Sequence, residues 1–174
     1  MQNNLLYKHT MTYGLYVGLA FSFIVFVMHL AGYPHVPGDS VGVFNALLMA
    51  MAFLYFGRKF RDLHFPEVFL YRHALGFAVL LSVFAAFIYS FFSYFYYAYL
   101  EPEGINYFIE QMRLAYSEKN KLPKEQVDAL VELYKNSLNP GSMAAIVFFY
   151  QVFSGVLLGL VMAVFVKTPA RYDK

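Results

Sequence analysis

The segment ALGFAVLLSVFAAFIYSFFSYFYYAYL, residues 74–100, contains no charged side chain. As a helix it would be roughly 40 Å long, which exceeds the roughly 30 Å hydrocarbon core of a bilayer. A lone apolar span must be helical there, because no water is present to hydrogen-bond its backbone. Its second half is rich in Phe and Tyr, whose rings favour the boundary between membrane and water. The segment therefore predicts a transmembrane helix whose aromatic end lies at a membrane surface.

The composition of the whole chain agrees with a membrane protein. Of its 174 residues 60% are hydrophobic and 14% are charged, whereas a soluble domain has nearer a quarter charged residues. The absence of cysteine excludes disulfides, thiolate metal sites and thiol catalysis. A net charge of +2, without a basic patch, gives no reason to expect a nucleic-acid partner. We expect residues 1–174 to form a single polytopic membrane domain.

Three further segments have the length and apolar character of membrane spans, namely residues 12–32, 40–56 and 143–166. With residues 74–100 they predict an all-α membrane protein with four transmembrane helices. The first span is expected to be retained, because no small-residue cleavage pattern follows it.

The connections between these spans differ in character. Two prolines and a glycine in residues 33–38 predict a turn, after which Asp39 or Ser40 would cap the second helix. The basic residues 57–62 predict a water-facing loop. Residues 64–73 are too short to cross the membrane, and Pro66 and Glu67 favour an interfacial helix there.

Residues 101–140 predict a two-helix amphipathic insert between the third and fourth spans. In each helix the apolar residues recur at helical spacing: Ile105, Phe108, Ile109, Met112 and Tyr116, then Val127, Leu130, Val131, Tyr134 and Leu138. Such a pair would cover the outer mouth of the bundle or lie flat among the lipid headgroups.

The distribution of basic residues predicts the orientation in the membrane. Most of the 13 Lys and Arg residues lie in the N-terminal segment, residues 57–73 and the C-terminal tail. With four spans these regions share one side, and the positive-inside rule places it in the cytoplasm. Residues 101–140 would then be periplasmic if the membrane is a bacterial inner membrane.

Small residues four positions apart indicate how the spans pack, because they allow helix backbones to approach closely in a membrane. Each span has such a GxxxG-like row, and its glycines are the predicted helix-packing residues: Gly14, Gly18, Gly42, Gly155 and Gly159. Some of these faces could contact another subunit instead, and the sequence leaves that alternative open.

Three polar residues within the spans, His29, Asn45 and Gln151, follow these small-residue faces in the predicted outer half of the membrane. They are either interhelical hydrogen-bond partners or a polar pocket rimmed by tyrosines. No span has Asp, Glu, Lys or Arg in its core, which argues against an ion-coupled transporter.

The sequence shows no constellation of catalytic residues, so we expect neither an enzyme nor a cofactor. Two groups that contain histidines are candidate metal ligands, namely His29 with His35, and His64 with Glu67 and His73. Neither has a convincing set of further ligands, so the prediction is that no metal binds.

Several of these features occur together in one known family. They are the basic loop GRKFR at residues 57–61, the long third span that follows Gly76, its Tyr-rich end before Glu101-Pro102, the amphipathic insert and Asn139-Pro140. In this order they resemble the bacterial four-span membrane family catalogued as domain of unknown function 4199 (DUF4199). The resemblance implies a Gram-negative inner-membrane protein and supplies no catalytic residues. It also implies a possible partner, because members are often encoded beside polyprenyl-phosphate glycosyltransferases.

The leading functional hypothesis is a non-catalytic accessory or assembly subunit that packs against a membrane-protein partner or forms a homo-oligomer in the bilayer. The alternative is a carrier or scaffold that binds a lipid-linked sugar in the outer leaflet. That site would use the tyrosine-rich helix end together with His29, Asn45 and Gln151.

Overall fold

The computed structural model describes residues 2–33, 40–65, 67–119 and 122–168, and these residues form helices without any strand. The four long helices are α1 (Gln2–Leu30), α2 (Ser40–His64), α3 (Tyr71–Phe95), which continues in the π-helical turn η1 (Tyr96–Leu100), and α6 (Pro140–Val166). Segments of all four are long and apolar enough to cross a membrane, namely Asn4–Leu30, Val41–His64, Tyr71–Leu100 and Pro140–Val166. The all-α class and the four membrane-length helices are thereby confirmed.

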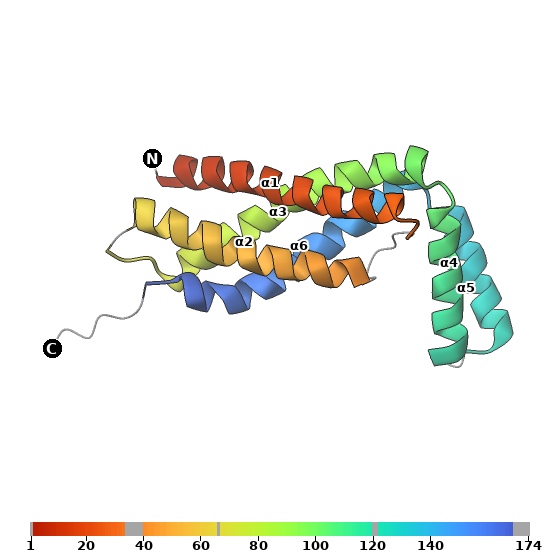
Figure 1. Ribbon diagram of the computed structural model, residues 1–174. Coiled ribbons are helices and arrows are strands. Elements are labelled where there is room, and N and C mark those ends of the chain that lie inside the picture. Colours follow the sequence, from red (N-terminus) through yellow and green to blue (C-terminus); the bar gives the residue numbers. More distant parts are fainter. Residues whose placement is uncertain (1, 34–39, 66, 120–121, 169–174) are drawn as a thin grey trace.

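The four long helices lie side by side, with α3 in contact with α1 and α6, and α2 against α6 (Figure 1). Two shorter helices, α4 (Gly104–Leu114), which continues in the π-helical turn η2 (Ala115–Lys119), and α5 (Lys124–Ser137), pack against each other. This α4–α5 hairpin lies across one end of the bundle (Figure 1). We call that end the hairpin end, and the opposite end, where α1 begins and α6 ends, the terminal end.

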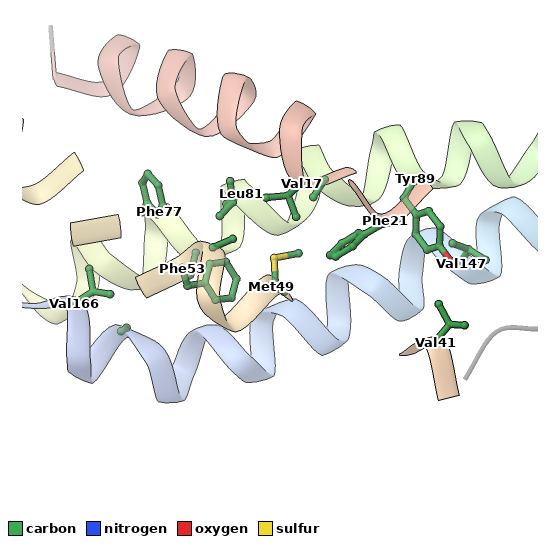
Figure 2. Packing of buried hydrophobic residues seen from close by; sticks show 14 of the residues in the cluster. Val17, Phe21, Val41, Met49, Phe53, Phe77, Leu81, Tyr89, Val147 and Val166 are labelled. Atoms are coloured by element: carbon green, nitrogen blue, oxygen red, sulfur yellow. The ribbon is translucent and has the colours of Figure 1, made fainter. Parts of the chain in front are cut away.

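A continuous core of buried side chains joins the four long helices (Figure 2). Phe21 of α1 and Tyr89 of α3 meet edge to face, with ring centres 5.7 Å apart. Met49 of α2 and Val147 of α6 are also buried in this cluster. Many large apolar side chains face outward instead, for example Phe23, Phe44, Phe87, Phe149 and Phe153. Such an apolar exterior indicates contact with a lipid bilayer.

The start of α6 follows from the local sequence. The backbone N–H of Ser142 donates to Asn139 Oδ1 at 3.0 Å, and the N–H of Asn139 donates to Ser142 Oγ at 2.8 Å. Pro140 occupies the first turn, where its missing N–H costs nothing. This reciprocal cap confirms the helix restart predicted at Asn139-Pro140 and places it three residues before the predicted span.

The predicted water-facing loop at residues 57–62 is wrong, because α2 remains helical through His64. Phe60 is buried and stacks on Phe77 with ring centres 5.3 Å apart, while Arg61 donates to the carbonyl of Val166 at 2.9 Å. These contacts hold the last turns of the helix against α3 and α6, so charged residues there do not end it.

The predicted interfacial helix at residues 64–73 is also wrong. Residues 67–70 are not helical, and α3 begins at Tyr71. The N–H of Phe69 donates to Thr168 Oγ1 at 2.8 Å, and the N–H of Thr168 donates to the carbonyl of Phe69 at 2.9 Å. This segment therefore satisfies its backbone against the chain after α6 instead of within a helix. The predicted turn at 33–38 and Asp39 fall largely outside the described residues, as does Pro66.

Candidate functional site

Two predicted packing glycines of α1 face α3. A Cβ atom on Gly18 would lie 2.7 Å from both the carbonyl oxygen of Ala85 and Ile88 Cβ, and one on Gly14 would lie 2.5 Å from Phe84 Cβ. Real Cβ atoms essentially never approach other atoms so closely, so only glycine allows α1 and α3 to be this near.

The glycines of α6 also face α3, from the other side. A Cβ atom on Gly159 would lie 2.9 Å from Ala78 Cβ, and one on Gly155 would overlap the side chain of Ser82. At Gly42 of α2 the nearest atom would be the Tyr150 hydroxyl at 3.4 Å, which is ordinary contact. Four of the five predicted glycines thus lie at tight helix contacts within the chain itself.

The structure brings two of the three predicted polar residues to one level. Met49 of α2 lies 3.8 Å from a Cβ built on Gly155 of α6. Asn45 lies one turn before Met49 in α2, and Gln151 lies one turn before Gly155 in α6. Because α2 and α6 run in the same direction (Figure 1), Asn45 and Gln151 lie at the same level of the bundle. Both side chains are buried, with exposed fractions of 3% and 4%. Asn45 Oδ1 is buried without a hydrogen-bond partner. An unpaired polar atom of this kind costs free energy, and it is an acceptor that a bound molecule could complete.

His29 does not join them. Its Nδ1 lies 3.0 Å from a carboxylate oxygen of Glu101, and its ring meets Tyr96 edge to face at 5.5 Å. It stands eleven residues beyond Gly18, which is roughly 16 Å along the helix. The His29–Glu101 pair therefore lies at the hairpin end, where it connects α1 to the residue that follows η1.

At the terminal end the structure brings together two histidines that the sequence did not pair. His9 Nε2 and His64 Nε2 are 3.0 Å apart, and the two ring centres are 4.8 Å apart. Phe60 packs against both rings, and Tyr13 stacks on Phe56 at 4.2 Å one turn further along α1. These contacts join the beginning of α1 to the end of α2.

Among the described residues, the structure does not bring the candidate metal-ligating histidines together. His64 faces His9, whereas His73 lies against the rings of Phe65 and Phe69. His35 lies outside the described residues. Within the described ranges no group of three or more His, Cys, Asp or Glu side chains is arranged to hold a metal ion. The signal that could have paired His9 with His64 is their position at the same end of the bundle, since His64 is the last residue of α2 and His9 lies about two turns after the start of α1.

One comparison with known proteins gives a match. The profile of a family described as protein of unknown function (DUF4199) matches residues 12–168, which confirms the resemblance drawn from the sequence. No curated protein and no solved structure matches the chain.

Proposed function

The chain belongs to the DUF4199 family of proteins of unknown function, and on that premise we propose that it is a non-catalytic accessory or assembly subunit of a membrane complex. The observation that supports this role is the α4–α5 hairpin, which lies across the end of the bundle and not along it (Figure 1). The packing glycines face other helices of the same chain, so a partner would have to dock elsewhere.

The hairpin offers such a docking surface. Ile105, Phe108 and Leu138 pack against the core cluster near the base of the hairpin. Three other apolar side chains of the two helices remain exposed: Tyr107, Leu114 and Leu133. We take the hairpin to be amphipathic, with one face on the bundle and membrane surface and these residues available to a second protein.

The distribution of charge supports an orientation for this arrangement. Lys8, Arg58, Lys59, Arg61 and Lys167 lie at the terminal end. We propose that this end is cytoplasmic and the hairpin periplasmic, in a bacterial inner membrane. The family resemblance suggests a polyprenyl-phosphate glycosyltransferase as the first partner to test.

The test is purification from membranes in mild detergent followed by mass spectrometry, with the wild type beside two hairpin variants. The triple variant Tyr107→Ser, Leu114→Ser, Leu133→Ser should lose the co-purifying partner. The control Lys124→Gln, Lys135→Gln changes exposed residues of the same hairpin and should retain it. A monomer without partner in every condition, or a partner that the triple variant retains, would contradict the proposal.

A second candidate function is a carrier or scaffold for a lipid-linked sugar, and the observation that favours it is the unpaired Oδ1 of Asn45. If a ligand completes this atom, Asn45→Leu should abolish binding of a polyprenyl-phosphate sugar in native mass spectrometry. If Asn45 has only a structural role, the same variant should leave stability equal or higher, because it removes a buried unpaired acceptor. Binding of the added lipid-linked sugar separates the two outcomes, because only the carrier role predicts that Asn45→Leu loses it.

A further inference from the structure

The helices α1 and α2 touch at the terminal end and leave a groove beyond that contact. Tyr13 stacks on Phe56, and past this stack an apolar groove of about 370 Å³ opens between the two helices. Its walls include the small side chains of Ala20 and Ala52, together with Leu48. The groove is open to the surface, and its apolar walls and volume of about 370 Å³ suit part of a lipid acyl chain.

A second hollow, of about 630 Å³, continues along α2 toward the terminal end. It shares Met51 and Tyr55 with the apolar groove, and its far part is lined by Arg58, Lys59 and Asp62. The apolar groove between α1 and α2 thus continues into an open surface that α2 alone lines, apolar near Met51 and cationic near Arg58 and Lys59. We call the groove and this surface together the channel.

The charge at that end suits an anion. Arg58 and Lys59 are exposed, and neither takes part in the ion pairs found among the described residues. The only carboxylate in the lining, Asp62, is already paired with Arg61 at 2.8 Å. A phosphate beside Arg58 and Lys59 would therefore meet two available cations and one carboxylate, Asp62, whose charge Arg61 balances in part.

The distance from the apolar end of the channel to Arg58 matches one leaflet of a membrane. From Leu48 to Arg58 the helix advances ten residues, or roughly 15 Å, which is half of a 30 Å hydrocarbon core. A lipid whose phosphate lies at Arg58 would thus extend its acyl chain to Leu48 near the bilayer centre.

We propose that this channel binds one anionic phospholipid of the leaflet at the terminal end, with its phosphate at Arg58 and Lys59 and an acyl chain between α1 and α2. The inference does not depend on the accessory role, because it concerns a different face of the molecule. Basic residues beside an apolar groove at the membrane surface are the chemistry that selects anionic over zwitterionic headgroups.

Native mass spectrometry of the full chain with added phosphatidylglycerol or phosphatidylcholine tests this directly. The wild type should bind one phosphatidylglycerol at least several-fold more tightly than phosphatidylcholine. The variant Arg58→Gln, Lys59→Gln should weaken phosphatidylglycerol binding about tenfold or more. The control Arg72→Gln, Lys167→Gln removes the same charge from the same end of the bundle outside the channel and should bind as the wild type does. Equal binding of both lipids, or equal loss in both variants, would overturn the proposal.

Two further variants examine the apolar part of the channel. Ala20→Phe should block the groove and lower the affinity for phosphatidylglycerol without any change of charge. Tyr55→Cys introduces a thiol into a chain that has no cysteine, and it should form no disulfide between copies in bilayers if lipid fills the channel. Unchanged affinity in Ala20→Phe, or efficient Tyr55→Cys crosslinking, would show that lipid does not occupy the groove.

Discussion

The contact between α3 and its neighbours α1 and α6 differs from the contact between α4 and α5. In the bundle, glycines bring backbones so close that one added carbon would meet Ala85 at 2.7 Å or Ala78 at 2.9 Å. In the hairpin, the two helices meet through long side chains, as in the hydroxyl contact of Tyr116 and Tyr134 at 3.3 Å. The first interface depends on the absence of side chains and the second on their presence.

This difference agrees with a bundle that lies in lipid and with the proposed position of the hairpin at the membrane surface. Apolar side chains in a bilayer are already surrounded by apolar lipid, so burying them between helices gives no hydrophobic stabilisation. Helices in a membrane therefore associate through close packing. A helix pair at the membrane surface can still bury apolar side chains from water, so it needs no close backbone approach. Substitutions of similar size should therefore have larger effects in the bundle than in the hairpin.

The largest effect is expected at the α1–α3 contact. Gly18→Ala should lower the free energy of unfolding by about 1–3 kcal/mol, because the new Cβ would press on the Ala85 carbonyl and Ile88. Gly76→Ala is the matched control, since a Cβ there meets no atom within 4 Å. It should raise stability by about 0.5–1 kcal/mol through helix propensity. Denaturant titration in detergent micelles measures both, and equal effects would mean that the α1–α3 contact is looser than described.

The α3–α6 contact gives a somewhat smaller effect and a sharper test. Gly159→Ala should destabilise because its Cβ would lie 2.9 Å from Ala78 Cβ. Adding Ala78→Gly removes that atom, so the double variant should recover part of the loss, with a coupling of about 0.5–3 kcal/mol. A double-mutant cycle measures this coupling. Strictly additive losses would show that the two positions do not touch.

The sequence predicts the bundle well because a membrane span requires a long uncharged helix, and such runs are visible in one dimension. It fails at the end of α2, where a run of charged residues indicates a loop although the chain is helical: Arg58, Lys59, Arg61 and Asp62. Charged residues do not end a helix that extends beyond the membrane. The last turns of α2 are held by the contact of Phe60 with Phe77 and by the hydrogen bond from Arg61 to Val166. Those partners are far away in the sequence.

Only the burial of the polar residues in the candidate site could be predicted from the sequence, and not the partners of its histidines. The small-residue rows anticipate that Asn45 and Gln151 face the interior, and both are buried. The partners of the histidines were not predictable, because His9 meets His64 and His29 meets Glu101 across segments that are distant in the sequence. The relative rotation and offset of two helices decide such pairs, and neither quantity can be read from hydropathy.

In the hairpin, a pH-dependent effect of modest size is expected. The hydrogen bond with Tyr116, together with burial, raises the pKa of Tyr134 above its ordinary value. A raised folded-state pKa stabilises the hairpin fully below the unfolded-state pKa of about 10, and this contribution is lost as pH rises through the folded-state pKa. Spin labels at Ser117 and Lys135 should therefore report hairpin opening above about pH 10 while the bundle persists.

Tyr134→Phe provides the control for this measurement, because it cannot ionise at that position. In this variant the distance between the labels should no longer change steeply above about pH 10. The same opening in both proteins would assign the transition to other groups of the hairpin.

The smallest effect is expected at the ion pair on the exposed face of α4. Arg113 donates to Glu110 through Nε at 2.9 Å and through a terminal guanidinium nitrogen at 2.8 Å, and this hydrogen bonding lowers the pKa of the Glu110 carboxyl. A lowered folded-state pKa contributes stability above the ordinary Glu pKa, and the contribution is lost as pH falls through the folded-state pKa.

Water and salt screen a pair that is fully exposed, so Arg113→Gln should leave the global unfolding transition unchanged. It should nevertheless return the Glu110 pKa to its ordinary value in a carboxyl ¹³C titration, while Arg113→Lys should return it only in part because it keeps the charge and loses the fork. A Glu110 pKa that does not respond to Arg113→Gln would mean that the pair does not form in solution. A measurable decrease in the global free energy of unfolding would contradict the expected order of effects. Loss of an exposed ion pair on the hairpin would then destabilise the protein as much as an added Cβ atom between α1 and α3.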